Sequence, residues 1–473
     1  ENIEQMYDDQ FIETCADWVV PYIGDLIGYR TLYGKALGVS SSRAEVAHTI
    51  ALRRRKGTAA VLEQLGRDVT GWNARAVEFF QVLATTQYMN HPRPANHYAP
   101  DLRQWESLER VGSAFDRVAH TVDVRRIASS NGIGHGLGRG RYNIPNVGIF
   151  LWPIEAQALT RSTAARVDDR RLRISALNHD MPLYNRPEAE TQITHIAEPH
   201  NVPLPLSRRV LHEDGTSLQS QYYGEGLSLA LYINGAFVPV DEVRICDLSD
   251  DGASWAHLPS DDSYAIDPLL GRVALPENPA VPITQVEVSH HYGFGAEISG
   301  GEYERADSFT ETPATGPAPT VLRVPDDHAL IQDALDALAG SGVVEITDNG
   351  RYVETLNVQV AADGRIELRA RNERRPSLVL TGEMTIAGGS DSTFELNGLL
   401  VSGEKLRVPA GARHALRYLR IAHATLVPGW ALTPSGAPQQ PDAPSLVVEI
   451  ANMEVRIEYA IVGLHRIWLK SGA

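Results

Sequence analysis

The sequence has little cysteine and no long apolar run. Its two cysteines, Cys15 and Cys246, lie far apart, so neither a disulfide framework nor a cysteine-rich metal site can form. This scarcity fits a reducing cytoplasm. No run of about 18 apolar residues is present, so the sequence predicts no membrane-spanning helix. The chain begins at Glu1 without an initiator methionine or an apolar targeting run, which suggests a trimmed N-terminus and gives no sign of secretion.

Positive charge is also in deficit. The formal net charge is −16, which repels phosphate backbones and anionic lipid. A nucleic-acid or membrane partner would therefore need a local basic patch, and the only candidate is the run at residues 53–56. This run lies at the end of a predicted helix, where cations complement the helix dipole. We therefore expect no nucleic-acid partner and no membrane insertion. The 473 residues predict about three domains.

The N-terminal segment has the apolar spacing of a coiled-coil seam. Ile12, Cys15, Val19, Tyr22 and Leu26 are spaced three, four, three and four residues apart. More apolar residues flank this seam, so the helix must be buried among others, within the chain or between chains, and Pro21 should kink or divide it. The predicted subunit interface consists of Ile12, Cys15, Trp18, Val19, Tyr22, Ile23 and Leu26.

Further helices are predicted after this segment. Ser42 and Glu45 form a capping box that opens a helix with Val46 and Ile50 facing inward. A second helix carries apolar residues from Val61 to Val69 and can end at Gly71. A third is expected through Val77, Phe80 and Leu83, and residues 92–205 are rich in proline and glycine. Residues 1–205 are therefore predicted to form a helical assembly domain with a loop-rich second half.

The apolar period changes after residue 205. Leu227, Leu229, Leu231 and Ile233 alternate with smaller or polar residues before Asn234-Gly235, a hairpin-turn signal. Residues 206–310 therefore predict a small antiparallel β-sandwich. Residues 311–320 are rich in proline and predict a semi-rigid linker.

Residues 321–473 predict a parallel β-helix. Asp326 or Asp327 should cap a helix with Ile331, Leu335 and Leu338 on one face. Short apolar strands then recur between turns, as expected for stacked coils: 343–346, 366–368, 378–380, 394–396, 399–401, 416–421 and 446–450. The pattern still reads as strand close to Ala473, so we expect the native chain to continue or a partner to seal the open end.

No motif predicts a catalytic, cofactor or metal site. Gly132–Gly140 lacks the following helix of a phosphate cradle, and Pro145 argues against one. The turn 247–252 resembles half a calcium loop, but Leu258 replaces the bidentate glutamate. His195 and His200 cannot share a helical face, whereas His290 and His291 should point to opposite faces of a strand.

The β-helix leaves an enzymatic alternative. This fold hosts polysaccharide hydrolases and lyases, whose acidic residues gather on one face of neighbouring coils. Asp348, Asp363 and Asp391 lie at predicted turns, where aspartate is expected without catalysis. The Asn-Thr-Asp, Asp-Asp and Gly-His-Gly strand motifs of the hydrolases are missing from residues 343–473. We therefore expect no enzyme activity.

Two N-terminal segments resemble phage tail protein I-like baseplate subunits. Residues 11–28 (FIETCADWVVPYIGDLIG) resemble the N-terminal signature, with Trp, Pro, Tyr, Gly and Asp in order. Residues 54–72 (RRKGTAAVLEQLGRDVTGW) resemble the next segment of that family. The resemblance covers about the first hundred residues. It implies a wedge subunit that joins two copies of a larger wedge partner through a helical bundle.

A third segment resembles β-helical extensions on wedge subunits of phage-tail-like injection systems: residues 424–430 (ATLVPGW). Short phage versions of the family lack the sandwich and the β-helix, so this resemblance leaves the role of residues 206–473 open.

Together these features predict a multidomain α+β and all-β protein with a structural role in the baseplate of a contractile injection system. The expected partners are other wedge subunits in a hetero-oligomeric ring, with the β-helix as a candidate for contact with a surface glycan. Assembly is expected in the cytoplasm, within a phage-tail-like particle that can be released. The alternative is a β-helical tail protein that degrades or binds polysaccharide.

Overall fold

The chain forms two compact units. The computed structural model describes residues 2–30, 42–93, 99–123, 141–190, 195–216, 220–279, 281–309, 318–411, 415–451 and 453–467. The N-terminal unit comprises Glu1–Ile154 and Pro187–Leu204, and the C-terminal unit comprises Glu155–Arg186 and Pro205–Ala473. Each unit has its own core.

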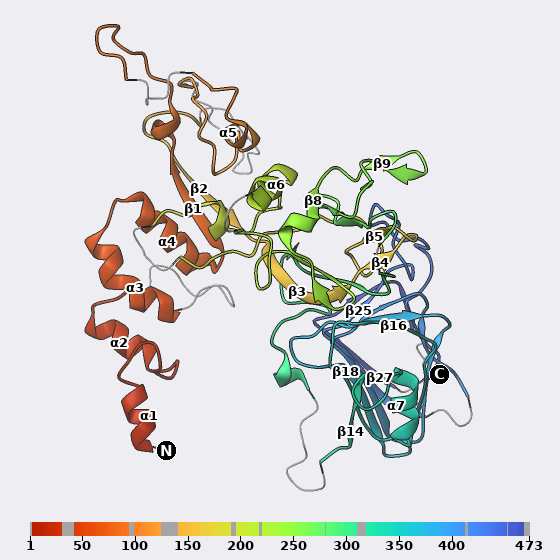
Figure 1. The fold of residues 1–473 in the computed structure, drawn as a ribbon. Helices are drawn as coiled ribbons and strands as arrows, with labels where there is room; N and C mark the ends of the chain where they lie inside the picture. Colours follow the sequence, from red (N-terminus) through yellow and green to blue (C-terminus); the bar gives the residue numbers. More distant parts are fainter. Residues whose placement is uncertain are drawn as a thin grey trace. The chain divides into compact units, whose positions relative to one another are not determined.

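Short helices open the N-terminal unit (Figure 1): α1 (Asn2–Asp8), α2 (Val20–Leu26), α3 (Ser42–Arg54) and α4 (Ala59–Thr70). The expected helix along the seam is wrong in its first half, because residues 9–19 form turns. There the Asp9 side chain accepts the backbone N–H of Ala16 at 2.9 Å, a local bond that competes with helix formation. Pro21 lies in the first turn of α2, where its missing N–H removes no helical hydrogen bond.

Helices α3 and α4 confirm two sequence predictions. Helix α3 begins at Ser42 and buries Val46, although Ile50 is exposed. Helix α4 ends at Gly71, whose φ of +72° is the left-handed conformation of a helix C-cap. The N–H of Gly71 donates to the carbonyl of Arg67 at 2.8 Å.

A two-stranded antiparallel ribbon follows in the N-terminal unit. It pairs β1 (Asn73–Glu78) with β2 (Val147–Trp152), and the 3-10 helix η1 (Phe79–Val82) follows β1. The helix expected through Val77, Phe80 and Leu83 is therefore wrong. Ala74 and Ala76 alternate into the core, and their strand is stabilised by a partner far along the chain. Local periodicity cannot report such pairing. The described part of this unit also contains α5 (Trp105–Glu109) and η2 (Pro199–Asn201).

An antiparallel sandwich opens the C-terminal unit. Two sheets, ordered β4-β5-β12-β11-β8 and β3-β13-β6-β7, share one apolar core. This part begins at residue 155, upstream of the boundary expected at residue 205. Its elements are β3 (Glu155–Thr163), β4 (Ala165–Arg166), β5 (Arg171–Arg173), α6 (Arg208–Thr216), β6 (Ala230–Ile233), β7 (Ala236–Phe237), η3 (Val240–Glu242), β8 (Val243–Ile245), β9 (Asp250–Asp251), β10 (Ser254–Trp255), β11 (Tyr264–Asp267), β12 (Arg272–Ala274) and β13 (Val286–Phe294).

The hairpin predicted within this sandwich is confirmed. Strands β6 and β7 pair antiparallel, with Ile233 opposite Ala236. Asn234 and Gly235, at φ of +49° and +84°, make the turn between them. Both positive values match a two-residue hairpin turn that follows the twist of the strands.

The predicted parallel β-helix is also confirmed. Three parallel sheets are ordered β14-β15-β18-β21-β24-β27, β16-β19-β22-β25-β28 and β17-β20-β23-β26-β29. Five successive coils therefore contribute one strand to each sheet. The strands are β14 (Val321–Val324), β15 (Gly342–Ile346), β16 (Arg351–Glu354), β17 (Asn357–Val360), β18 (Arg365–Ala370), β19 (Ser377–Leu380), β20 (Met384–Gly388), β21 (Ser392–Asn397), β22 (Leu400–Ser402), β23 (Leu406–Val408), β24 (Leu416–Ala422), β25 (Thr425–Leu426), β26 (Leu446–Val448), β27 (Glu454–Glu458), β28 (Ile461–Val462) and β29 (His465–Ile467).

Helix α7 (Ile331–Ala337) packs on the first part of this β-helix (Figure 1), but it is not capped by Asp326 or Asp327. The carboxylate of Glu354, in β16, accepts the backbone N–H groups of Ile331 and Gln332, both at 3.0 Å. Asp327 instead accepts the N–H of Arg323. The cap therefore comes from a strand later in the chain.

Residues 295–309, here called the strap, run from the sandwich along the β-helix and contact all five coils. The strap includes η4 (Ala306–Ser308). Its partners on successive coils, from the first to the fifth, are Asn349, Asn372, Asn397, His423 and Tyr459. The linker predicted at residues 311–320 lies mostly outside the described residues.

Candidate functional site

The residues predicted to form a subunit interface divide into a buried and an exposed group. Cys15 and Val19 are buried, at 2% and 9% exposure, in a cluster that includes Val46 of α3. Ile12 and Ile23 pack against the same cluster. These four predicted residues are therefore brought together by contacts within the chain.

Two arginines of α3 hold the N-terminal segment in place. Arg43 donates to the carbonyl oxygens of Ile12 and Cys15, both at 2.6 Å. Arg53 donates to the carbonyl of Ile27 at 2.9 Å. Both arginines satisfy carbonyl groups that a continuous helix would otherwise have bonded. The buried side of the segment is thus fastened to α3 by apolar packing and by hydrogen bonds.

The opposite side of the segment is an open aromatic surface. Trp18, Tyr22 and Leu26 are 66%, 65% and 87% exposed. The Trp18 and Tyr22 rings meet edge to face at 6.2 Å between centroids, and Tyr7 and Phe11 form a similar pair at 5.3 Å. The seam spacing predicts Tyr22 and Leu26, and Trp18 belongs to the predicted apolar flank of the seam, whereas Tyr7 lies outside this pattern and is not predicted. Contiguous exposed rings of this kind mark interaction sites.

A polar cleft of about 610 Å³ lies elsewhere in the N-terminal unit. Buried Asp68 accepts hydrogen bonds from His48 at 3.0 Å and from Gln64 at 2.7 Å. Arg67 donates to Glu190 at 2.5 Å. The cleft is lined by His48, Ala51, Gln64, Arg67, Asn73, Pro187, Glu188, Ala189, Glu190 and Asn201.

Glu190 is the carboxyl group lining this cleft whose pKa is shifted. Burial raises the pKa of Glu190, and the nearby charge of Glu63 adds to this effect against the opposing attraction of Arg67. No serine, threonine or cysteine is among the described residues that line the cleft, so it offers no hydroxyl or thiol nucleophile.

A second hollow, of about 570 Å³, lies in the sandwich and is lined in part by α6 and β8. Cys246 lines it beside His257. Burial raises the pKa of the Cys246 thiol to about 11, and the charges of Asp267 and Asp247 act in the same direction. The thiol is therefore protonated at neutral pH and is a weak nucleophile.

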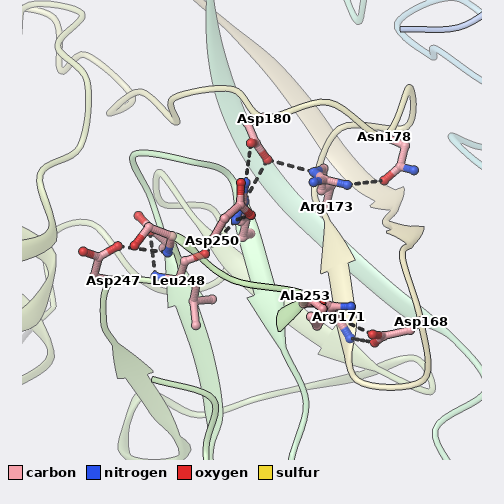
Figure 2. Close-up of polar contacts among 12 residues, drawn as sticks. Asp168, Arg171, Arg173, Asn178, Asp180, Asp247, Leu248, Asp250 and Ala253 are labelled. Carbon is pink, nitrogen blue, oxygen red and sulfur yellow. Dashed lines mark hydrogen bonds and ion pairs between the residues drawn. The ribbon is translucent and has the colours of Figure 1, made fainter. Parts of the chain in front are cut away.

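Figure 2 shows the ion pairs that stabilise one end of the sandwich. Asp180 accepts from Arg173 at 2.8 Å and from Arg272 at 2.8 and 2.5 Å. Arg272 is 2% exposed, also pairs with Asp250 at 2.7 Å, and lies 4.6 Å from the Trp255 ring centroid. This network has the burial and full pairing of a structural element.

Two of the three aspartates considered for a carbohydrate site, Asp363 and Asp391, lie at equivalent turns of neighbouring coils, whereas Asp348 lies at a different turn. Asp363 and Asp391 lie at turns with positive φ, and Asp348 accepts the hydroxyl of Tyr352 at 2.8 Å. A second pair of adjacent carboxylates, Glu367 and Glu395, lies in register on neighbouring coils. The sequence pattern does not reveal this pair, because the parallel register depends on the length of each coil.

These two carboxylates are not open to solvent. Glu367 and Glu395 are 0% and 2% exposed. Arg369 lies 3.3 Å from Glu367, and Arg420 lies 3.3 Å from Glu395. Arg420 also donates to the strap carbonyl of Ser308 at 2.7 Å. The pair is thus held in an arginine ladder next to the strap.

The two histidine pairs considered as metal ligands lie in different environments. His195 and His200 each approach a glutamate, at 3.4 and 3.7 Å. His290 and His291 are buried in β13, where desolvation lowers both pKa values, that of His290 to about 3. Among the described residues, no group of three or more potential ligands could hold a metal ion. The motif Gly132–Gly140 lies outside the described residues.

None of the helices described in the chain has the length and apolar character needed to cross a membrane. No protein-family model, curated protein or solved structure matches the chain.

Proposed function

We propose that this chain is a structural wedge component of the baseplate of a contractile injection system, assembled through its N-terminal segment. The observation that carries the proposal is the open aromatic surface of Trp18, Tyr22 and Leu26, on the side of the segment opposite the one that packs on α3. The resemblance of residues 11–28 to tail protein I-like subunits falls on the same segment.

The proposed role is mechanical. The segment is fastened to its own chain by Arg43 and Arg53, so a partner bound to the open side would be joined to a rigid base. Assembly would take place in the cytoplasm with other wedge subunits, and rearrangement of these contacts would pass a signal to the contracting sheath. The β-helix would be peripheral, a candidate for contact with a surface glycan.

The β-helix favours a second candidate, a protein that degrades or binds polysaccharide. Glu367 and Glu395 are one pair of adjacent carboxylates that such a site could use. They are buried and paired with arginines, so a substrate could reach them only if the strap moved away. We therefore rank this candidate second.

The assembly proposal is tested by purifying the tagged full chain from cells that naturally produce it and measuring the mass of the complex. Trp18→Ser with Leu26→Ser removes exposed apolar area, so the folded chain should be retained but the complex lost. Tyr88→Ser with Met89→Ser is the matched control, because these residues are also exposed, at 68% and 91%. A complex of normal mass from the first variant would contradict the proposal. Glycan release by the purified chain, lost in Glu395→Gln, would favour the second candidate.

A further inference from the structure

The N-terminal segment has an extreme charge composition. Its first 29 residues include seven acidic residues and no lysine, arginine or histidine, in a chain with a net charge of −16. The seven are Glu1, Glu4, Asp8, Asp9, Glu13, Asp17 and Asp25. Nearly half of the net charge therefore lies in this short segment.

The chain already holds the covered side of this segment with basic groups. Asp17 pairs with Arg43 at 2.8 Å, and Arg53 donates to the carbonyl of Ile27 at 2.9 Å. Apolar packing of Cys15 and Val19 accompanies these contacts. The covered side thus combines an apolar centre with arginines at its margin.

The open side of the segment, like the covered side, combines apolar and acidic residues, but its acidic residues have no basic partners among the described residues. Asp8, Glu13 and Asp25 are exposed, and within the described parts of the chain none of them makes an ion pair. Asp25 lies three residues after Tyr22, so the two side chains are neighbours on the surface of α2. The exposed Tyr22 ring therefore has beside it a carboxylate that makes no ion pair among the described residues.

We infer that the open side binds a different protein chain, whose apolar stripe is bordered by arginine or lysine. This inference rests on the proposed assembly function and adds the chemistry of the partner. The rings would supply buried area, while the carboxylates would select a basic partner and increase the rate of encounter. Arg43 of α3 already makes such a pair with Asp17 of this segment, within the chain.

A second copy of the segment is a poor occupant. Pairing two copies would bring two sets of acidic residues together with no basic residue from either segment. Like charges next to each other across an interface act against association. Charge therefore selects a basic partner and disfavours self-association.

The test uses the full chain and three synthetic amphipathic helical peptides that share one leucine stripe. Their flanking positions carry arginine, glutamine or glutamate, and fluorescence anisotropy measures each dissociation constant. At low salt the arginine peptide should bind about tenfold more tightly than the glutamine peptide. In high salt this advantage should shrink, because ions screen exposed charges.

Two charge-reversal variants separate a local effect from the overall negative charge. Asp8→Lys with Glu13→Lys and Asp25→Lys should reverse the order, so that the glutamate peptide binds best. Asp262→Lys, Asp326→Lys and Asp442→Lys change the net charge equally at exposed sites in the C-terminal unit, and should preserve the original order. Identical behaviour of the two triple variants would overturn the inference.

Failure of the inference is distinguishable from failure of the assembly proposal. If Trp18→Ser with Leu26→Ser binds all three peptides like the unmodified chain, the aromatic surface is not a binding surface and both fail. If that variant loses binding to every peptide while charge reversal has no local effect, only the inference about partner charge fails. Self-association lost in the serine variant, measured by sedimentation, would also overturn it.

Discussion

The guanidinium group of Arg305 lies against the α-carbon of Gly398, leaving no room for a side chain there. A β-carbon added at Gly398 would come within 2.7 Å of Arg305 Nε, and the glycine has a φ of +82°. Arg305 donates to the carbonyls of Gly301, Arg371 and Arg374 at 2.6, 2.7 and 2.5 Å. The strap and the β-helix are therefore joined at a point that only glycine fits.

Gly398→Ala should destabilise the C-terminal unit by about 2–4 kcal/mol, because it adds a steric overlap to an unfavourable backbone conformation. Gly226→Ala is the matched control, since its φ is +77° and nothing lies within 4 Å of the added carbon. Gly226→Ala should lower the free energy of unfolding by only about 1 kcal/mol, because it adds the unfavourable backbone conformation without a steric overlap. Urea unfolding measures both, and equal losses would argue against the contact with Arg305.

Asp180 should make the stability of the sandwich depend on pH in the acid range. Burial alone would raise its pKa, but hydrogen bonds from Arg272 and Arg173 outweigh that effect and lower it. A lowered pKa contributes stability that is fully present above the unfolded pKa, about 3.9, and is lost as the pH falls through the lower, folded-state value. Asp180→Asn should flatten this dependence.

The same substitution should destabilise the sandwich at pH 7 by about 3 kcal/mol, because buried Arg272 loses its bidentate partner. Asp168→Asn is the control, since this carboxylate pairs with Arg171 but is 44% exposed. It should cost less than about 1 kcal/mol. Thermal unfolding at several pH values measures the stability of both variants. Equal losses of stability would show that the burial of Asp180 does not strengthen its ion pairs.

Glu63 should be essential for the ribbon in the N-terminal unit. It is 0% exposed, and its carboxylate oxygens accept the backbone N–H groups of Ala76 and Ala197, both at 2.8 Å. Glu63→Gln replaces one acceptor by a donor, so a buried N–H loses its bond at a cost of about 2–3 kcal/mol. Hydrogen exchange in β1 should accelerate. Exposed Glu188→Gln is the control and should leave exchange unchanged.

Cys246 should resist alkylation in the native chain. With a pKa of about 11, only about one thiol in a thousand is ionised at pH 8. Reaction with iodoacetamide should therefore be slow at pH 8 and accelerate toward pH 10.5, as peptide mass spectrometry would record. Rapid native alkylation at pH 8 would contradict the assigned burial. Denatured chain serves as the positive control.

The β-helix could be predicted because each of its strands is specified by residues close together in the sequence. Each strand is a short apolar run bounded by turn residues, so strands such as 343–346 and 378–380 matched the observed β15 and β19 closely. The same holds for Gly71 and for the Asn234-Gly235 turn, where a single residue type fits the backbone. Local chemistry of this kind needs no knowledge of distant residues.

The errors arise where distant residues decide the structure. Strand β1 forms because β2 pairs with it, and helix α7 is capped by Glu354 from a later strand. The turns at residues 9–19 depend on a bond from Asp9 that competes with the helix. For the candidate surface, spacing found the apolar residues but could not tell which of them α3 covers.

The strap changes how the β-helix can come apart. In a stack where each coil touches only its neighbours, opening an end coil leaves the interior unaffected, so ends fray first. Here one covalent segment contacts every coil, from Asn349 in the first to Tyr459 in the last. Detaching an end coil would therefore also break a tie to the others. Under a force along its axis the β-helix should therefore unfold cooperatively in one step. A β-helix without such a segment would unfold one coil at a time.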